Sequence, residues 1–144
     1  MPRCSEHLHC CLYFTANALA RNIGKLADAA FQEIGLSPSH AFMLQLVNEQ
    51  PGITQKELAE YLSLAPSTLT RFADRLVYRG YVERDQKGKV VRIYPTSEGK
   101  ALKQPIEKAW TRLYKDYSAI LGEQPGIALT RLIDQANRHL EDLG

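Results

Sequence analysis

Two short capped segments separated by a tight turn occupy residues 54–79, and they restrict the fold more than any other part of the sequence. Thr54, with Glu57 three residues later, fits a capping box, which predicts a helix beginning after the threonine. A three-residue turn follows, and Pro66 then suits the first position of a second helix, because its missing N–H would have no partner there. Gly80 can adopt the left-handed conformation that ends this helix. The segment is therefore predicted to be a helix-turn-helix.

A basic β-hairpin is predicted directly after these helices. Residues 81–84 and 90–94 are rich in β-branched and aromatic side chains, and they flank the polar turn Asp85-Gln86-Lys87-Gly88-Lys89. Between residues 71 and 92 the sequence has seven Lys or Arg against three Asp or Glu, a net charge of +4. Because the whole chain carries +2, the remainder carries −2, and the basic charge is concentrated in this region.

The order helix, turn, helix and basic hairpin is that of a winged helix-turn-helix, in which the second helix enters the major groove of DNA. The segment from Pro66 fits this role, since its helical period separates an apolar from a polar side. The side chains expected to face inward are Leu69, Phe72, Ala73, Leu76 and Val77. Those expected to face outward are Ser67, Arg71, Asp74 and Tyr78, with Thr68, Thr70 and Arg75 on the flanks.

Arg71 is the leading candidate for reading bases, because a guanidinium can make a bidentate contact with guanine. Lys87 and Lys89, at the hairpin tip, are placed to reach phosphates or the minor groove. A carboxylate is unfavourable beside phosphate, so Asp74 is expected to pair with a basic side chain of the hairpin. The alternative, a solvated helix face without a ligand, is disfavoured by the adjoining basic hairpin. The predicted DNA contacts are Thr54, Gln55, Pro66, Ser67, Thr68, Thr70, Arg71, Arg75, Lys87, Lys89 and Arg92.

Long helices are predicted on both sides of this region. Apolar residues at three- and four-residue steps indicate one helix from about Leu8 to Gly35, and Ser37-Pro38 begins a second. The same period indicates one long helix after Thr96 and a last one after Pro125-Gly126. The predicted fold class is mainly α with a small β-hairpin wing.

Three runs within this region, residues 53–62, 67–71 and 76–84, closely resemble the MarR family of bacterial transcription regulators, as does Thr96-Ser97-Glu98-Gly99 after the hairpin. The resemblance implies a homodimer whose first and last helices interlock, bound to a pseudo-palindromic operator in double-stranded DNA. It also implies a regulator, by default a repressor, that a signal releases. Two features depart from the family pattern: the turn at residues 85–89 makes a shorter wing, and Ala65 stands where a serine or aspartate often caps the recognition helix.

The resemblance divides the chain into three parts. Residues 1–36 are the expected N-terminal dimerisation helix, residues 37–99 the winged helix-turn-helix, and residues 100–144 the C-terminal dimerisation helices.

The N-terminal segment holds cysteines and histidines that allow three interpretations. The thiols can be inert small side chains. Cys10 or Cys11, together with Cys4 and Tyr13, can form a redox sensor like that of the organic-peroxide-sensing branch of the MarR family. Cys4, His7 and Cys11 share one helical face and have the ligand chemistry of a zinc or copper(I) site, although no cofactor is required for DNA binding.

The resemblance further implies a small-molecule effector, and Trp110, Tyr114 and Tyr117 are candidates to line its pocket. An enzyme is disfavoured, because the sequence has no phosphate loop or hydrolase elbow and only scattered histidines beyond the N-terminus. A purely helical protein-interaction module would not require the basic hairpin. The sequence also lacks an apolar run long enough to span a membrane, and the odd cysteine count suits a reducing compartment, so a cytoplasmic location is expected.

Overall fold

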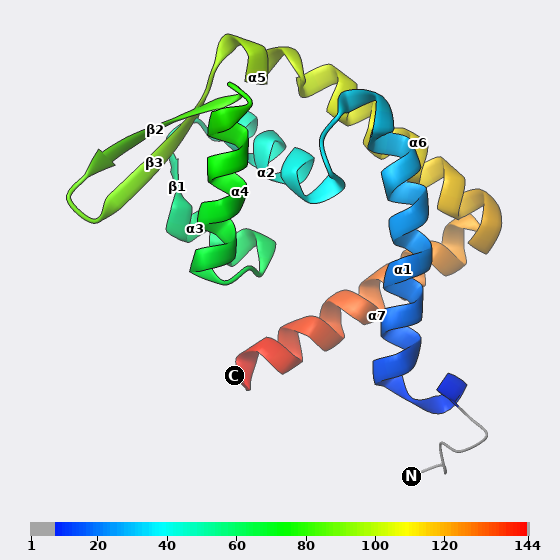
Figure 1. The fold of residues 1–144 in the computed structure, drawn as a ribbon. Coiled ribbons are helices and arrows are strands. Elements are labelled where there is room, and N and C mark those ends of the chain that lie inside the picture. The colour runs from blue at the N-terminus through cyan, green and yellow to red at the C-terminus, as the bar shows by residue number, and fades with distance from the viewer. Residues whose placement is uncertain (1–7, 144) are drawn as a thin grey trace. The chain divides into compact units, whose positions relative to one another are not determined.

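The computed structural model describes residues 8–143, most of them helical (Figure 1). The elements in chain order are η1 (Leu8–Cys10), α1 (Leu12–Phe31), η2 (Gln32–Ile34), α2 (Pro38–Glu49), β1 (Ile53–Thr54), α3 (Gln55–Leu62), α4 (Pro66–Tyr78), β2 (Val82–Lys87), β3 (Val90–Pro95), α5 (Ser97–Ala101), α6 (Lys103–Leu121) and α7 (Glu123–Asp142), where η denotes a 3-10 helix. The chain forms two compact units. We call Ala30–Ala109 the winged-helix unit, and residues 8–29 with 110–143 the terminal unit.

The helices of the winged-helix unit begin at side-chain caps that the sequence marks. Ser37 Oγ accepts a hydrogen bond from the backbone N–H of His40 at 3.2 Å, and Thr54 Oγ1 accepts one from Glu57 at 3.1 Å. Both caps confirm the predicted helix starts. At α4 the N-cap is Ala65, which has no side-chain hydrogen bond, so Pro66 alone favours the start of this helix.

The predicted turns around α3 and α4 are also confirmed. Ser63 ends α3 with a φ of 51°, a left-handed conformation that is uncommon for a residue with a side chain. Gly80 follows α4 with a φ of 77°, where glycine has no steric penalty. The two helices therefore form the expected helix-turn-helix.

The wing is part of a three-stranded antiparallel sheet in the order β1-β3-β2. The hairpin was predicted, but its strands are longer than expected, because Asp85 and Gln86 pair with Arg92 and Val91. Lys87 pairs with Val90, so the turn is confined to residues 88–89. These polar residues pair through their backbones and need no buried face. The third strand, β1, was not predicted: it is two residues long, and Ile53 lies opposite Ile93 of β3.

The core of the winged-helix unit gathers apolar side chains from its helices and its sheet. Its fully buried large members are Phe31, Met43, Leu44, Val47, Ile53, Leu58, Leu69, Leu76, Val82, Ile93 and Ile106. Gly99 of α5 lies against this core, where an added Cβ would be 2.1 Å from the carbonyl oxygen of Tyr81. A side chain is therefore excluded at position 99.

Three helix predictions need correction. The first helix, expected from about Leu8 to Gly35, is α1 over Leu12–Phe31, with the 3-10 helices η1 and η2 on either side. The long helix expected after Thr96 is broken at Leu102 into α5 and α6. Pro105 explains the break, because it has no N–H to donate to the carbonyl of Ala101, four residues earlier. The last helix begins at Glu123 and not after Gly126, since Pro125 fits within its first turn.

The terminal unit contains most of α1, the second half of α6, and α7. Arg112 Nη1 donates to the carbonyl oxygen of Ala29 at 3.3 Å and links α6 to α1. Many large apolar side chains of this unit remain exposed, among them Leu12, Tyr13, Ile120, Leu132, Leu140 and Leu143. None of the helices within residues 8–143 is both long enough and apolar enough to cross a membrane.

Candidate nucleic-acid interface

Helix α4 presents the polar face that its sequence predicts. Leu69, Ala73 and Leu76 are buried, and Phe72 is half-buried. The four residues expected to face outward, Ser67, Arg71, Asp74 and Tyr78, are all exposed. Val77 departs from the prediction: it is 38% exposed, because it lies at the edge of the buried face and not within it.

Arg84 of β2 joins the wing to the helix-turn-helix through three partners. Its Nη1 lies 2.7 Å from Asp74 Oδ1, its Nη2 donates to the carbonyl oxygen of Thr70 at 3.1 Å, and its Nε donates to Gln55 Oε1 at 3.0 Å. The expected pairing of Asp74 with a basic hairpin residue is thus confirmed. Arg84 was not among the predicted site residues, because nothing in the hairpin pattern separates it from the other basic residues.

Several predicted DNA contacts also have structural roles. Thr54 caps α3, and Gln55 Nε2 lies 3.5 Å from Thr70 Oγ1, which itself donates to the carbonyl oxygen of Pro66 at 3.0 Å. Arg92 Nη1 donates to the carbonyl oxygen of Gly52 at 2.9 Å and fixes β3 to the loop before β1. These side chains are held in place before any ligand arrives.

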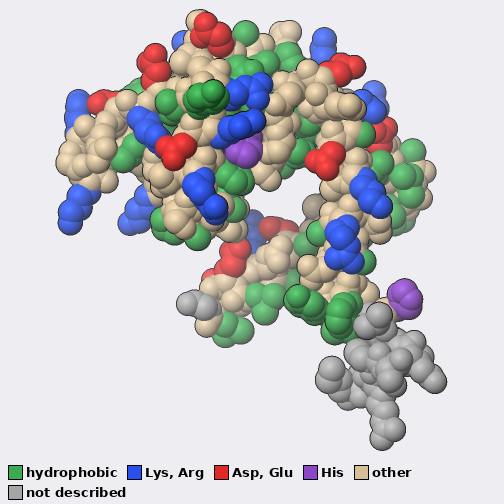
Figure 2. All heavy atoms as spheres, viewed as in Figure 1, with side chains coloured by type: hydrophobic (Ala, Val, Ile, Leu, Met, Phe, Trp, Pro, Cys, Tyr) green, Lys and Arg blue, Asp and Glu red, His purple; other side chains and the backbone are tan. Residues whose placement is uncertain are grey.

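The remaining predicted contacts are available to solvent, apart from Thr68, which is half-buried. Pro66, Ser67, Arg71 and Arg75 are exposed on α4, and Lys89 is exposed at the hairpin tip. Lys87 Nζ lies 4.0 Å from Asp85 Oδ2 on an exposed strand, an ion pair of little strength. Figure 2 shows Lys and Arg side chains gathered over the hairpin and α4. The winged-helix unit therefore has one basic face that combines a rigid helix with a wing.

The predicted sensing residues lie at the start of the described chain or before it. Cys4 and His7 fall outside the described residues. Cys10 is exposed, Cys11 is half-buried, and the ring of Tyr13 meets that of Phe14 edge-on at 5.4 Å. Within residues 8–143 no three His, Cys, Asp or Glu side chains are grouped to hold a metal ion, so the predicted Cys4, His7 and Cys11 site stays a prediction.

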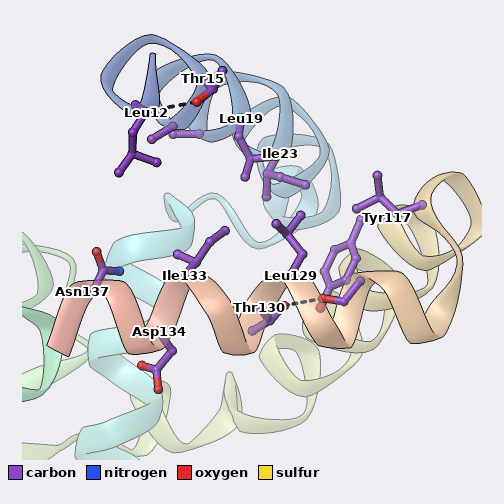
Figure 3. A pocket seen from close by; sticks show the side chains of 14 residues that line it. Leu12, Thr15, Leu19, Ile23, Tyr117, Leu129, Thr130, Ile133, Asp134 and Asn137 are labelled. Carbon is purple, nitrogen blue, oxygen red and sulfur yellow. Dashed lines mark hydrogen bonds between the residues drawn. The ribbon is translucent and has the colours of Figure 1, made fainter. Parts of the chain in front are cut away.

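The terminal unit has an apolar groove of about 640 Å³ between α1 and α7. Figure 3 shows Leu19 and Ile23 of α1 facing Leu129 and Ile133 of α7 across it. Of the predicted effector-binding aromatic residues, Tyr117 lines this groove, whereas Trp110 and Tyr114 do not. Tyr114 instead donates a hydrogen bond to Glu123 Oε1 at 3.0 Å, and its ring meets Tyr117 edge-on at 5.5 Å. The structure does not bring the three aromatic residues together around this groove.

Comparison with known proteins agrees with this geometry. Residues 36–89 match the model of the MarR family. The uncharacterized HTH-type transcriptional regulator YybA of Bacillus subtilis is 27% identical over 85 residues, which are 57% of this chain and 57% of that protein. The chain thus matches little more than half of YybA's length.

The solved structures show the same fold over nearly the whole chain. The transcriptional repressor CouR bound to a 23-mer DNA duplex is 20% identical, with a TM-score of 0.82 and coverage of 95% of this chain and 99% of CouR. The PcaV transcriptional regulator of Streptomyces coelicolor, in complex with its natural ligand, is 20% identical, with a TM-score of 0.80 and coverage of 96% of each chain. The relatives are described as transcription regulators and not as enzymes. Residues 36–89 thus resemble the MarR family, and the chain has the fold of the transcription regulators solved as CouR and PcaV.

Proposed function

We propose that this protein binds a pseudo-palindromic operator in double-stranded DNA as a homodimer and represses transcription until a signal releases it. The observation that carries the proposal is the arrangement of α4 and the wing. Arg71 is exposed on α4, while Arg84 ties the same helix to β2 through Asp74 and Thr70. Sequence-specific binding in the major groove uses a helix in a fixed position and side chains that are available to contact bases. Helix α4 and Arg71 meet both conditions.

The charges divide into two roles in this proposal. Arg71 reads a base, because its guanidinium makes no ion pair or hydrogen bond with another described residue and is able to make a bidentate contact with guanine. Lys87 and Lys89 lie at the end of the hairpin and contact phosphates, which carry no sequence information. The comparison with CouR, which has been solved bound to a DNA duplex, supports DNA as the ligand.

The terminal unit supports a homodimer. The groove between α1 and α7 is lined mainly by apolar side chains, and beyond it Leu132 and Leu140 are 64% and 61% exposed. Apolar surface of this extent is unfavourable in water, and a second copy offers helices of the same apolar character. A symmetric dimer would present two recognition helices about 34 Å apart, one turn of DNA.

The N-terminal cysteines favour an alternative in which the same regulator senses an oxidant. Cys10 is exposed, so its thiolate can take one oxygen atom from an organic hydroperoxide, giving a sulfenate and the corresponding alcohol. Cys11, the next residue, is half-buried at the start of α1. A zinc or copper(I) site made by Cys4, His7 and Cys11 would use the same segment, and a small molecule, as in PcaV, is the third candidate signal.

A fluorescence anisotropy titration tests the proposal directly. Reduced, metal-free protein is titrated against DNA from upstream of its own gene and against a scrambled duplex at several salt concentrations. We expect at least a hundredfold preference for the upstream DNA, with affinity falling steeply as salt rises. Equal affinity for both duplexes that does not change with salt would contradict the proposal.

The same titration separates the signals when it is repeated after cumene hydroperoxide. Loss of binding that a thiol reductant restores supports the oxidant sensor, and Cys10→Ser should then prevent the loss. Binding unaffected by hydroperoxide rules the oxidant sensor out. A release by stoichiometric zinc or copper(I) would assign the metal site in its place.

A further inference from the structure

Ser37 is an exposed serine that lines a pocket in the winged-helix unit. The pocket has a volume of about 460 Å³, lies between the start of α2 and helix α4, and is lined by Gly35, Leu36, Ser37, His40, Arg71, Phe72 and Arg75. The backbone at Ser37 is extended, and in the loop before it the carbonyl oxygen of Gly35 accepts a hydrogen bond from Arg79 Nη1 at 3.2 Å. An enzyme can therefore reach the serine hydroxyl, and the loop that carries it is held in place at the end of α4.

Two arginines of α4 line the same pocket without a carboxylate partner. Within residues 8–143, neither Arg71 nor Arg75 has an Asp or Glu oxygen within ion-pair distance. Asp74, which lies between them in sequence, is held by Arg84 at 2.7 Å. A phosphate group in this pocket would make charge-assisted hydrogen bonds with two guanidinium groups that have no other anion.

The position of Ser37 on its helix also suits a negative charge. Ser37 is the N-cap of α2, and its Oγ accepts a hydrogen bond from the backbone N–H of His40 at 3.2 Å. The partial positive charge at the N-terminus of this twelve-residue helix stabilises a phosphate beside it. A phosphoserine gains contacts at a helix N-terminus or opposite an arginine cluster, and Ser37 combines the two settings.

The ring of His40 would add a third contact. Ser37 Oγ lies 2.5 Å from His40 Nδ1, and the ring is stacked on that of Phe72 with the centroids 4.2 Å apart. Burial, together with the charge of Arg75, lowers the pKa of His40, so the ring is neutral and its Nδ1 accepts the serine hydroxyl hydrogen. A phosphate on Ser37 would replace that hydrogen and favour the protonated ring, which would then donate to the phosphate.

We propose that Ser37 is a phosphorylation site whose phosphoryl group is held by Arg71 and Arg75 and switches DNA binding off. A protein kinase transfers the γ-phosphoryl group of a nucleoside triphosphate: a bond forms between Ser37 Oγ and phosphorus, the bond from phosphorus to the bridging oxygen breaks, and the nucleoside diphosphate and a proton leave. The regulatory consequence rests on the proposed function. Because Arg71 is the proposed base reader, a phosphate that binds its guanidinium removes it from the operator.

Capture of the phosphate is tested without DNA, on the whole chain with phosphoserine introduced at a single position during translation. The matched control carries it at Ser39, an exposed serine of the same helix that does not line the pocket. In ³¹P spectra recorded over a range of pH, the phosphate on Ser37 should lose its second proton at a lower pH than the phosphate on Ser39, because two guanidinium groups favour the dianion. Arg75→Gln should reduce this difference. Identical titration of the two phosphates would overturn the capture.

The effect on DNA is measured by the anisotropy titration with the same two phosphorylated proteins. Phosphate on Ser37 should weaken operator binding about tenfold or more, and alkaline phosphatase should restore it, whereas phosphate on Ser39 should weaken it less than about threefold. Equal weakening by both would reflect only repulsion between negative charges and would contradict the switch. Unmodified protein that fails to prefer the operator would contradict the proposed function and leave the ³¹P result intact, so the two failures are distinguishable.

Occurrence of the modification is tested by peptide mass spectrometry of the protein isolated from its own cells, in growth and in stationary phase. We expect phosphate on Ser37 in at least one of these states. Ser37→Asn keeps a helix cap but cannot be phosphorylated, so cells with this variant should keep the regulated genes repressed in the state in which Ser37 is otherwise phosphorylated. Absence of phosphate from Ser37 in both states would overturn the proposal.

Discussion

Arg84 Nη1 and Asp74 Oδ1 lie 2.7 Å apart, an ion pair that joins β2 to the middle of α4 across ten residues of sequence. The arginine side chain is 28% exposed and the aspartate 58%, so solvent screens part of the attraction. The same guanidinium holds Gln55 and the carbonyl of Thr70. These three interactions of Arg84 therefore fix the orientation of the wing relative to α4.

Replacing Arg84 should accordingly lower the stability of the winged-helix unit. Arg84→Ala removes three interactions and should lower the free energy of unfolding by about 1–2 kcal/mol, measured by urea denaturation. Arg84→Lys keeps a charge but not the three-way geometry and should recover only part of this loss. The control is Lys87→Ala, whose exposed 4.0 Å pair should contribute less than about 0.5 kcal/mol. Equal effects of Arg84→Ala and Lys87→Ala on the free energy of unfolding would contradict the role of Arg84 in joining the wing to α4.

The two proposed roles of basic residues predict different losses in DNA binding. Arg71→Ala should cost about 1–3 kcal/mol on the operator and relax the preference over scrambled DNA, because it removes a base contact. Lys87→Ala should weaken both duplexes similarly and reduce the salt slope by about one. Anisotropy titrations at several salt concentrations measure both. If Arg71→Ala bound its operator unchanged, another residue would be the base reader.

The lowered pKa of His40 predicts a pH dependence of stability. Since burial beside Arg75 disfavours the protonated ring in the folded state, the unfolded state binds the proton first as the pH falls. The free energy of unfolding should therefore decline from the usual histidine pKa of 6.5 down toward the lowered value in the folded protein. Denaturation curves between pH 7.5 and 5 measure this slope. His40→Gln should show a shallower decline, and an identical decline in both proteins would exclude His40 as its source.

Gly99 should tolerate no side chain. In Gly99→Ala the new Cβ would lie 2.1 Å from the carbonyl oxygen of Tyr81, a backbone atom that cannot move independently, so we expect a loss of about 3 kcal/mol or more. Gly24→Ala is the matched control in α1, because no atom lies within 4 Å of its added Cβ. That variant should be stabilised by about 0.5–1 kcal/mol. Thermal unfolding distinguishes the two, and a fully stable Gly99→Ala would show that α5 can shift.

The proposed homodimer depends on the groove between α1 and α7. Ile133→Asp places a charge among its apolar side chains and should convert the dimer to monomer, as measured by sedimentation equilibrium. Arg131→Gln, two residues away on α7, should leave the oligomeric state unchanged. A dimer that survives Ile133→Asp would have its interface elsewhere. Loss of the dimer should also lower operator affinity steeply, because each half-site would then bind alone.

Local patterns determined much of the helix-turn-helix. The starts of α2 and α3 follow from the Ser37 and Thr54 caps, the start of α4 from Pro66, and its end from Gly80. These signals operate within four residues, so they can be read from the sequence without knowing what packs around them. Pro105 is a local signal of the same kind for the break at Leu102. The break was not predicted, because the apolar residues keep a helical period across it.

The tertiary structure decided which basic side chains of the hairpin connect it to the rest of the winged-helix unit. Arg84, Arg92 and Lys87 look alike in the hairpin sequence, yet only the folded sheet places the first against Asp74 and the second against Gly52. His40 and Phe72 are 32 residues apart and stack only because α2 packs on α4. The strand β1 likewise exists through its pairing with β3. Periodicity and capping act along the chain, whereas ion pairs, ring stacking and strand pairing depend on distances that only the packed chain sets.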